Sequence, residues 1–379
     1  MNNDIARPAA KAKEPSTDAP NDQHRYQRSK RTYDEAIVQD QVIERALANE
    51  MQNLKNIAAA LKEKRIKRIY ILGCGDSWFS GVGVRYAFEK LLGIPVEPMQ
   101  ALDFSLYYHS TVDPKTLVVG ISSGGNTKAV IDALNQAKTR GAITIGVTNT
   151  QGSPITKTFD HAIYVDATRK GWPTQASTAA MAILIQLALL LADKDRINNR
   201  NELKTLQEDL DAIPMIVSKV IKMADDPIKS LAEEIHKCRF MFFSAGGPSF
   251  AAAAFGAAKV KELCPIHAEA IPLEEFHHYR SLKPGDPLFL VAPDQESHER
   301  ALDTAEVGTY DGGKVFAIIP EGEEAIKAAA TWSLALPKVN PLLTAIVYSV
   351  PLHLFAYYLS MAKFENNLGY VSAFPNPGE

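Results

Sequence analysis

The stretch that most constrains the fold is an apolar, β-branched run that ends abruptly in small residues. Residues 117–121 (LVVGI) are followed by SSGGNT at 122–127 and then by a helical pattern over 128–140. An apolar run of this length predicts a buried parallel strand, and the small residues predict a tight connection into a helix. The chain must therefore accommodate a strand, a glycine-rich loop and a helix N-terminus in succession.

Two interpretations of this loop remain open from its own residues. Glycines allow close backbone approach, amides at a helix start point outward, and the hydroxyls of Ser122, Ser123 and Thr127 add donors, so the loop can bind an anion such as phosphate. Alternatively, the glycines form only a tight turn, with Asn126 or Thr127 as N-cap. The loop is neither a Walker loop nor a GxGxxG dinucleotide fingerprint.

The same pattern recurs elsewhere in the first half. The apolar run 68–73 ends in Cys74-Gly75-Asp76-Ser77 before a helical stretch, and further strands are predicted at 96–100, 143–147 and 162–165. Strands that alternate with helices predict a parallel sheet covered on both faces, with ligands at the carboxyl ends of the strands. Asp76 and Ser77 lie at such an end. Ser177, which opens an apolar helix, either caps that helix or faces the ligand.

The second half of the chain repeats the first. Residues 240–249, 287–293 and 314–319 match 68–77, 116–121 and 142–147, and the last two strands are 26 residues apart in both halves (143 − 117 and 314 − 288). A period of about 170 residues is that of a whole domain rather than of a solenoid repeat. The sequence therefore predicts an α/β protein with two duplicated αβα sandwich domains and parallel sheets.

The charge, the apolar runs and the cysteine count limit the kinds of binding partner that we expect. The net charge of −3 gives no reason to expect nucleic acid or an anionic membrane surface, and the apolar runs 179–192 and 342–359 are expected to be buried helices. Three cysteines without CxxC spacing argue against disulfides and structural zinc, which favours a reducing, cytoplasmic location. Because no HExxH-like spacing appears, we expect no metal, and we expect no other cofactor.

The composition shifts also predict the domain boundaries. Residues 1–32 are expected to be a disordered polar tail, 33–193 a first domain with an N-terminal helix, and 194–236 a helical connector. A second domain is expected at 237–363 and a C-terminal tail at 364–379.

Charged residues in the second domain give a candidate for chemistry. Lys259 and Glu262 stand at i, i+3 in a helical pattern, so they share a face and form an ion pair, reach a ligand, or simply lie in water. The run HAEA at 267–270 follows, and then Glu274, His277 and His278.

The run from 255 to 278, together with the loop motifs of the first half in the same order, resembles the sugar isomerase (SIS) domains of the glucosamine-6-phosphate synthase group. The resemblance covers roughly residues 34 to 363 and implies flavodoxin-like SIS domains. It also implies that a sugar 6-phosphate is the ligand, that Glu262 moves a proton between sugar carbons, and that His278 aids ring opening from the neighbouring subunit of a homodimer with shared sites. The implied substrate-binding residues are Asp76, Ser77, Ser122, Ser123, Asn126, Thr127, Ser177 and Lys259.

The departures from the synthase pattern matter for the reaction. This sequence has a short polar N-terminal stretch in place of a glutaminase domain, and no lysine follows Lys363, where the synthase and similar deaminases carry a Schiff-base lysine. Phe255 stands in place of a glutamate and Gly124 in place of a serine. Glu262 and His278 are kept, 16 residues apart, as in the SIS deglycases that split fructoselysine 6-phosphate.

The resemblance, with these departures, therefore implies a deglycase that cleaves a 6-phosphorylated ketosamine to glucose 6-phosphate and a free amine. The amine half is expected near Arg169, Trp172, Tyr279 or the C-terminal tail, and Tyr370 in that tail is a candidate for closing the site. Two alternatives remain open: an aldose-ketose isomerase or aminosugar-phosphate deaminase with the same two residues, and a non-catalytic sugar-phosphate-binding regulator.

Overall fold

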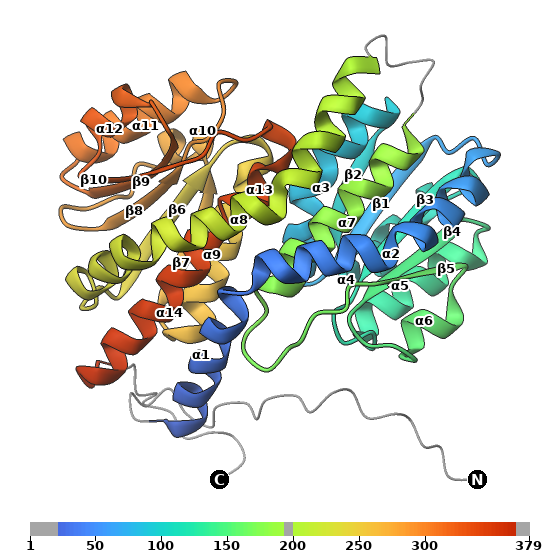
Figure 1. Ribbon diagram of the computed structural model, residues 1–379, viewed down its shortest axis with the longest axis horizontal. Helices are drawn as coiled ribbons and strands as arrows, with labels where there is room; N and C mark the ends of the chain where they lie inside the picture. The colour runs from blue at the N-terminus through green and yellow to red at the C-terminus, as the bar shows by residue number, and fades with distance from the viewer. Residues whose placement is uncertain (1–21, 193–199, 369–379) are drawn as a thin grey trace. The chain divides into compact units, whose positions relative to one another are not determined.

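A computed structural model describes residues 22–192 and 200–368, and its contacts divide the chain into two compact units (Figure 1). Among the described residues, unit 1 contains 38–169, 175–192 and 200–215, and unit 2 contains 22–37, 170–174 and 216–368. The boundary between residues 215 and 216 falls inside helix α8 (Arg200–Glu234).

Unit 1 is built on a sheet of five parallel strands in the order β2-β1-β3-β4-β5. The strands are β1 (Arg68–Gly73), β2 (Val96–Gln100), β3 (Thr116–Ile121), β4 (Ile143–Thr148) and β5 (His161–Tyr164). Every residue of β3 is buried because helices cover both faces of the sheet. The order reverses between β1 and β3, so the carboxyl ends of these two strands form the topological switch point where parallel sheets bind ligands.

The helices of unit 1 lie on both faces of its sheet. Tyr70, Leu72 and Val118 point to one face and pack with Val130 and Leu134 of α5, whereas the alternate residue Ile71 meets α3 on the other face. Helix α7 packs against α2 and α3. The helices are α2 (Gln39–Lys62), α3 (Asp76–Leu92), α4 (Ala101–Asp103), α5 (Lys128–Thr139), α6 (Pro154–Thr158) and α7 (Gln175–Leu191), with a π-helix at Phe104–Tyr108 and a 3₁₀ turn at His109–Thr111.

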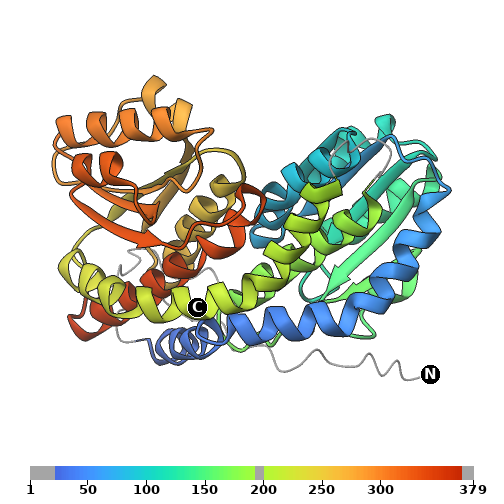
Figure 2. The same cartoon turned by 45° about the horizontal axis from the view of Figure 1, so that its top comes forward.

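Unit 2 repeats this plan with five parallel strands in the order β10-β9-β8-β6-β7. They are β6 (Phe240–Ala245), β7 (His267–Pro272), β8 (Pro287–Val291), β9 (Lys314–Pro320) and β10 (Trp332–Leu336). Figure 2 shows helices on both sides of the sheet in each unit.

One face of the second sheet packs on α10, α11 and α12, and the other packs on α9 and α14, where Phe289 stacks on Phe243 and contacts Phe355 at a tilt. The helices of unit 2 are α1 (Gln23–Ala36), α9 (Phe250–Leu263), α10 (Leu273–His278), α11 (His298–Tyr310), α12 (Glu324–Ala329), α13 (Thr344–Val347) and α14 (Val350–Glu365), with 3₁₀ turns at Gly247–Ser249 and Pro341–Leu343.

The predicted fold class is confirmed: two duplicated units carry parallel sheets between helical layers. The strands that sequence analysis did not identify are β7 and β10. Both lie at an edge of the second sheet and are partly exposed, so polar residues interrupt the apolar run that marks a buried strand.

The predicted polar tail is wrong where it overlaps the described residues, because 23–36 form helix α1. The helix also belongs by its contacts to unit 2, although sequence analysis assigned residues from 33 onward to the first domain. Its apolar signal is weak because the residues it buries are mostly polar: Arg28, Ser29, Thr32, Glu35 and Ala36. Residues 1–21 and most of the predicted C-terminal tail, with Tyr370, lie outside the described residues.

One helical stretch, Pro341–Glu365, is long and apolar enough to cross a membrane. Within unit 2, however, 89% of its most apolar window is buried. We therefore assign it to the core of this unit, which agrees with the interpretation of residues 342–359 as buried helix.

Candidate functional site

The loop after β3 is a tight structure that requires a glycine. Ser122 N donates to Val147 O, which extends the sheet by one residue, and Gly125 N then turns back to donate to Ser122 O at 2.8 Å. Gly125 has φ +67°, and a Cβ placed on it would lie 2.0 Å from Ser153 Oγ. Both the backbone conformation and the close approach exclude other side chains at this position.

The hydroxyls of this loop fall into two groups. Ser122 Oγ and Thr127 Oγ1 lie 2.8 Å apart, and Thr127 N donates to Ser122 Oγ at 3.3 Å, so this pair closes the loop at the start of α5. The Ser123 hydroxyl instead accepts from Asn149 Nδ2 at 2.8 Å, which ties the loop to the end of β4. Asn126 is exposed at the tip of the loop.

Arg169, which sequence analysis expected near the amine half of the substrate, lies against this loop. A Cβ on Gly124 would be 3.1 Å from Arg169 Nη1, so the guanidinium contacts the loop backbone. Arg169 follows β5, and the carboxyl ends of parallel strands share one edge of a sheet. That shared edge is the signal that could have joined Arg169 to the loop, and the combination of amides, hydroxyls and guanidinium suits an anion.

Asp76 and Ser77 open α3 directly after β1, on the other side of the switch point. Gly75 supports this turn with φ +55°, and a Cβ on it would meet no atom within 4 Å. Ser177 lies buried in the first turn of α7, which packs on α3. Within the described part of unit 1, no hydrogen bond joins Ser77 or Ser177 to the loop after β3.

Lys259 and Glu262 are brought together on α9 of unit 2. The Lys259 side chain is completely buried, and its Nζ lies 2.5 Å from Glu262 Oε2, while the Glu262 side chain is 35% exposed. A buried ammonium is tolerated when a charged partner and hydrogen bonds compensate for lost hydration. The pair therefore presents a carboxylate that is oriented by a cation and still open to a reactant.

His353 of α14 is a buried neighbour of this pair. Burial, with a smaller contribution from the Lys259 ammonium, lowers the pKa of His353 to about 3. The imidazole is thus neutral in the folded protein over the physiological range. Sequence analysis singled out no role for His353, which lies within the apolar run 342–359.

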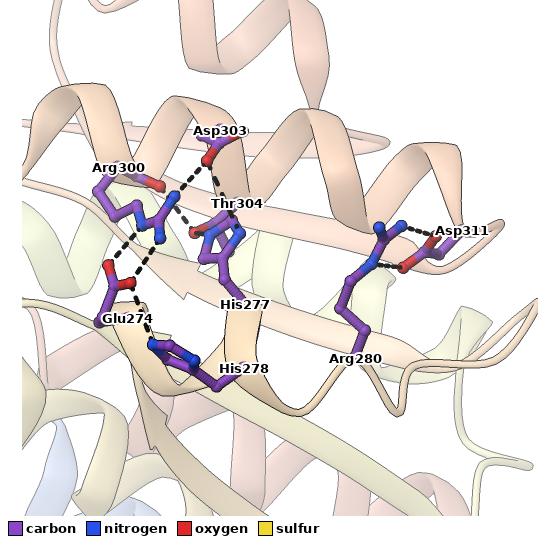
Figure 3. A network of polar contacts seen from close by, with 8 residues as sticks. All are labelled: Glu274, His277, His278, Arg280, Arg300, Asp303, Thr304 and Asp311. Carbon is purple, nitrogen blue, oxygen red and sulfur yellow. Dashed lines mark hydrogen bonds and ion pairs between the residues drawn. The ribbon is translucent and has the colours of Figure 1, made fainter.

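His278 lies in a different environment, on the surface of α10 (Figure 3). Its side chain is 63% exposed, and its Nε2 is 3.4 Å from Glu274 Oε1. Glu274 in turn accepts two hydrogen bonds of 2.7 Å from Arg300, which lower the pKa of this carboxyl. No hydrogen bond or ion pair within the described part of unit 2 joins His278 to Glu262.

His277, next in the chain, points to α11 (Figure 3). Its Nε2 lies 2.9 Å from Thr304 Oγ1, and its Nδ1 is 3.7 Å from Asp303 Oδ2. Desolvation lowers the pKa of His277, and the Arg300 charge adds to that effect. His277 is therefore a packed, oriented residue, whereas His278 is available to a reactant or to another chain.

Two of the residues expected near the amine half differ in accessibility. Trp172 is buried, with the Arg28 guanidinium 4.3 Å above its ring, whereas Tyr279 is 70% exposed beside His278. In the described ranges, no three His, Cys, Asp or Glu side chains are grouped so that they could hold a metal ion.

The loop geometry predicts that Gly125→Ala weakens binding of a sugar phosphate by at least about tenfold, because a strained φ and a steric clash both open the loop. Isothermal titration calorimetry with glucose 6-phosphate measures this. Gly152→Ala is the matched control: Gly152 also has a positive φ (+73°), but the nearest atom to its added Cβ is 3.9 Å away. Equal affinities of the two variants would contradict the assignment of the loop.

The buried imidazole predicts a pH dependence of stability. The folded pKa of His353, about 3, lies below the unfolded value of about 6.5, so the unfolded chain binds the extra proton between these values. The contribution of His353 to the free energy of unfolding is complete above about pH 6.5, and it falls by up to about 1.4 kcal/mol per pH unit as the pH decreases. Urea unfolding from pH 7 to 4 should show the free-energy difference between the wild type and His353→Gln shrinking. A free-energy difference between the two proteins that stays constant with pH would contradict the low pKa of His353.

Comparison with known proteins supports the fold and the order of these elements. The SIS domain family model matches residues 64–192 and 234–363. Glutamine-fructose-6-phosphate aminotransferases (isomerizing) from Clostridium tetani and Thermus thermophilus are 31% and 30% identical over 86% and 82% of this chain. The matched regions cover 54% and 52% of those proteins, so the chain matches about half the length of these curated relatives.

Solved structures show the same fold at lower sequence identity. The C-terminal domain of glucosamine-fructose-6-phosphate aminotransferase from Francisella tularensis has a TM-score of 0.76 at 23% identity, covering 90% of this chain and 96% of that one. Tagatose-6-phosphate ketose/aldose isomerase from Escherichia coli has a TM-score of 0.70 at 19% identity, covering 87% and 92%. With two matched domains over most of its length, this chain belongs to the SIS domain family.

Proposed function

We propose that this protein is a deglycase that cleaves a 6-phosphorylated ketosamine, such as fructoselysine 6-phosphate, to glucose 6-phosphate and a free amine. The observation that carries the proposal is the Lys259–Glu262 pair, a carboxylate oriented at 2.5 Å by a buried ammonium and partly open to solvent. Such a carboxylate suits a general base that removes a proton next to a carbonyl or imine carbon.

The loop after β3 binds the phosphate in this proposal. The partly exposed Thr127 supplies a hydroxyl that the buried Ser122 hydroxyl orients, the start of α5 supplies amides, and Arg169 supplies a positive charge beside Gly124. Asp76, Ser77, Asn126 and Ser177 remain proposed contacts of the sugar. Ser123 contributes by fixing the loop to β4 through Asn149.

The reaction follows from the roles of two side chains. His278 assists opening of the sugar ring, after which Glu262 removes a proton from C1 while the carbonyl oxygen on C2 takes up a proton from water, which gives an enaminol. Glu262 returns its proton to C2 and the nitrogen releases its proton to water, which leaves an imine at C1. Water adds to the imine carbon, the C–N bond breaks with proton transfer to nitrogen, and glucose 6-phosphate and the amine are released.

Two features favour a deglycase over a synthase or an isomerase. Because a ketosamine already carries its amine, the reaction needs no Schiff base with the enzyme, and no lysine occurs among residues 364–379. The exposed Tyr279 beside His278 offers an aromatic surface for the amine half of the substrate. The relatives named above act on sugar phosphates by name, which supports the substrate class.

We also propose a cytoplasmic homodimer in which His278 serves the site of the neighbouring subunit. The His278 side chain is exposed, and no hydrogen bond or ion pair joins it to Glu262 in the described part of unit 2, which supports this assignment.

Replacing Glu262 by Gln tests the base. We expect turnover of fructoselysine 6-phosphate to fall by about 10²- to 10⁴-fold, the typical contribution of a positioned acid or base, with glucose 6-phosphate binding retained. Released glucose 6-phosphate and amine are quantified together, with Glu306→Gln, an exposed exchange on α11, as control.

Stoichiometric amine and glucose 6-phosphate from the ketosamine alone support the deglycase. Interconversion of fructose 6-phosphate, or ammonia from glucosamine 6-phosphate, would replace it by an isomerase or a deaminase. Full turnover by Glu262→Gln would remove Glu262 from the mechanism.

The shared site predicts complementation between inactive subunits. Glu262→Gln and His278→Ala are each expected to be inactive, but a mixed dimer contains one site with both native residues. Random re-association after mild unfolding should restore about one quarter of wild-type activity, because about half of the dimers are mixed and each has one working site. Recovery below a few per cent, with mixed dimers shown by native mass spectrometry, would place both residues in the site of a single chain.

A further inference from the structure

Helix α1 is firmly attached to unit 2 by contacts with α14. The Tyr26 ring stacks on Phe364 with centroids 4.4 Å apart, and the Ser29 and Ser360 hydroxyls lie 3.1 Å apart in a buried position. Tyr33 adds a stack on Tyr357 at 4.5 Å. These contacts fix the orientation of α1 along the helix that also carries His353.

The same helix holds the segment 170–174 through buried polar groups. The Glu35 carboxylate accepts from Lys170 N at 2.8 Å and Gly171 N at 3.0 Å, and Thr32 Oγ1 accepts from Trp172 N at 2.8 Å. A Cβ on Gly171 would lie 2.4 Å from Thr32 N, so only glycine permits this approach. These hydrogen bonds therefore fix the position of the C-terminal half of α1 as well.

The N-terminal turn of α1 contacts the end of the helix that bears the proposed base. Arg25 Nη1 donates to Glu262 O at 2.8 Å across 237 residues of sequence. Helix α9 ends at Leu263, so this carbonyl is one of the last four, which have no partner within the helix. A guanidinium there satisfies the carbonyl and also complements the negative end of the helix dipole.

We infer that Arg25 is a positioning residue for Glu262, and that α1 is part of the machinery of the proposed reaction. Helix ends fray readily, and Glu262 lies in the last turn of α9. Lys259 orients the carboxylate, while Arg25 fixes the backbone from which that side chain starts. The inference about catalysis rests on the proposed function, whereas the effect on the helix end does not.

Arg25→Met, which keeps the length but removes the donor and the charge, tests this inference. We expect kcat for the ketosamine to fall about 10- to 100-fold with KM changed less than about twofold, because displacing a catalytic group by about 1 Å has effects of this size. Arg25→Lys should restore most of kcat. Arg31→Met, an exposed exchange on the same helix, is the matched control and should resemble the wild type.

Amide hydrogen exchange provides a readout that is independent of activity. In Arg25→Met, amides at 259–264 should exchange at least about tenfold faster, with those of α14 unchanged. Equal exchange in Arg25→Met and Arg31→Met, or faster exchange throughout α14, would overturn the inference, the latter because α1 would then have a general structural role. If the wild type cleaves no ketosamine, the proposed function fails, and the exchange result alone decides whether Arg25 holds the end of α9.

Discussion

The central constraint in this structure is a lysine ammonium placed where water cannot reach it. Lys259 is completely buried on α9, and its charge is compensated in part by the Glu262 carboxylate at 2.5 Å. This arrangement also defines what Glu262 can do. When Glu262 accepts a proton, Lys259 loses its anionic partner, so the field of the ammonium favours giving the proton back. A base that must take a proton from one carbon and return it to the next benefits from such a neighbour.

In the proposed function, the duplicated units use one framework for two kinds of chemistry. Ser122 N donates to Val147 O in unit 1, and Ala292 N donates to Ile318 O in unit 2. The two residues are therefore equivalent, and the Ser122 hydroxyl of unit 1 corresponds to the Ala292 methyl group of unit 2. Two residues later, unit 1 has Gly124 and unit 2 has Asp294, whose carboxylate caps the turn at Ser297. The Asp294 carboxylate makes the second loop less suited to an anion than the first, and the acid-base groups of the proposed reaction lie on helices of unit 2.

The sequence predicted the features that follow from local pattern. The strands at 68–73, 96–100 and 116–121 appear at the expected bounds. The i, i+3 spacing allowed the ion pair between Lys259 and Glu262, but only as one of three interpretations, and it did not predict that Lys259 is buried. The features that sequence analysis missed depend on contacts between residues that are distant in sequence. Helix α1 buries polar side chains whose partners are backbone amides more than a hundred residues away, so no apolar periodicity marks it. Arg169 reaches the loop after β3 only because two strand ends meet at one edge of a sheet.

The attachment of α1 has a consequence for how the chain is made. The Ser29–Ser360 contact joins residues 331 apart, so α1 leaves the ribosome long before its binding surface on α14 exists. At about 5–20 residues per second, the helix waits roughly 20 to 60 s without that partner. During that interval the rings of Tyr26 and Tyr33 have no α14 to stack on. The polar residues Arg28, Thr32 and Glu35 keep α1 compatible with water until α14 is made. A helix with an apolar stripe in the same place would lack the acceptors that bind the amides of 170–172, and it would expose an aggregation-prone surface until α14 is made.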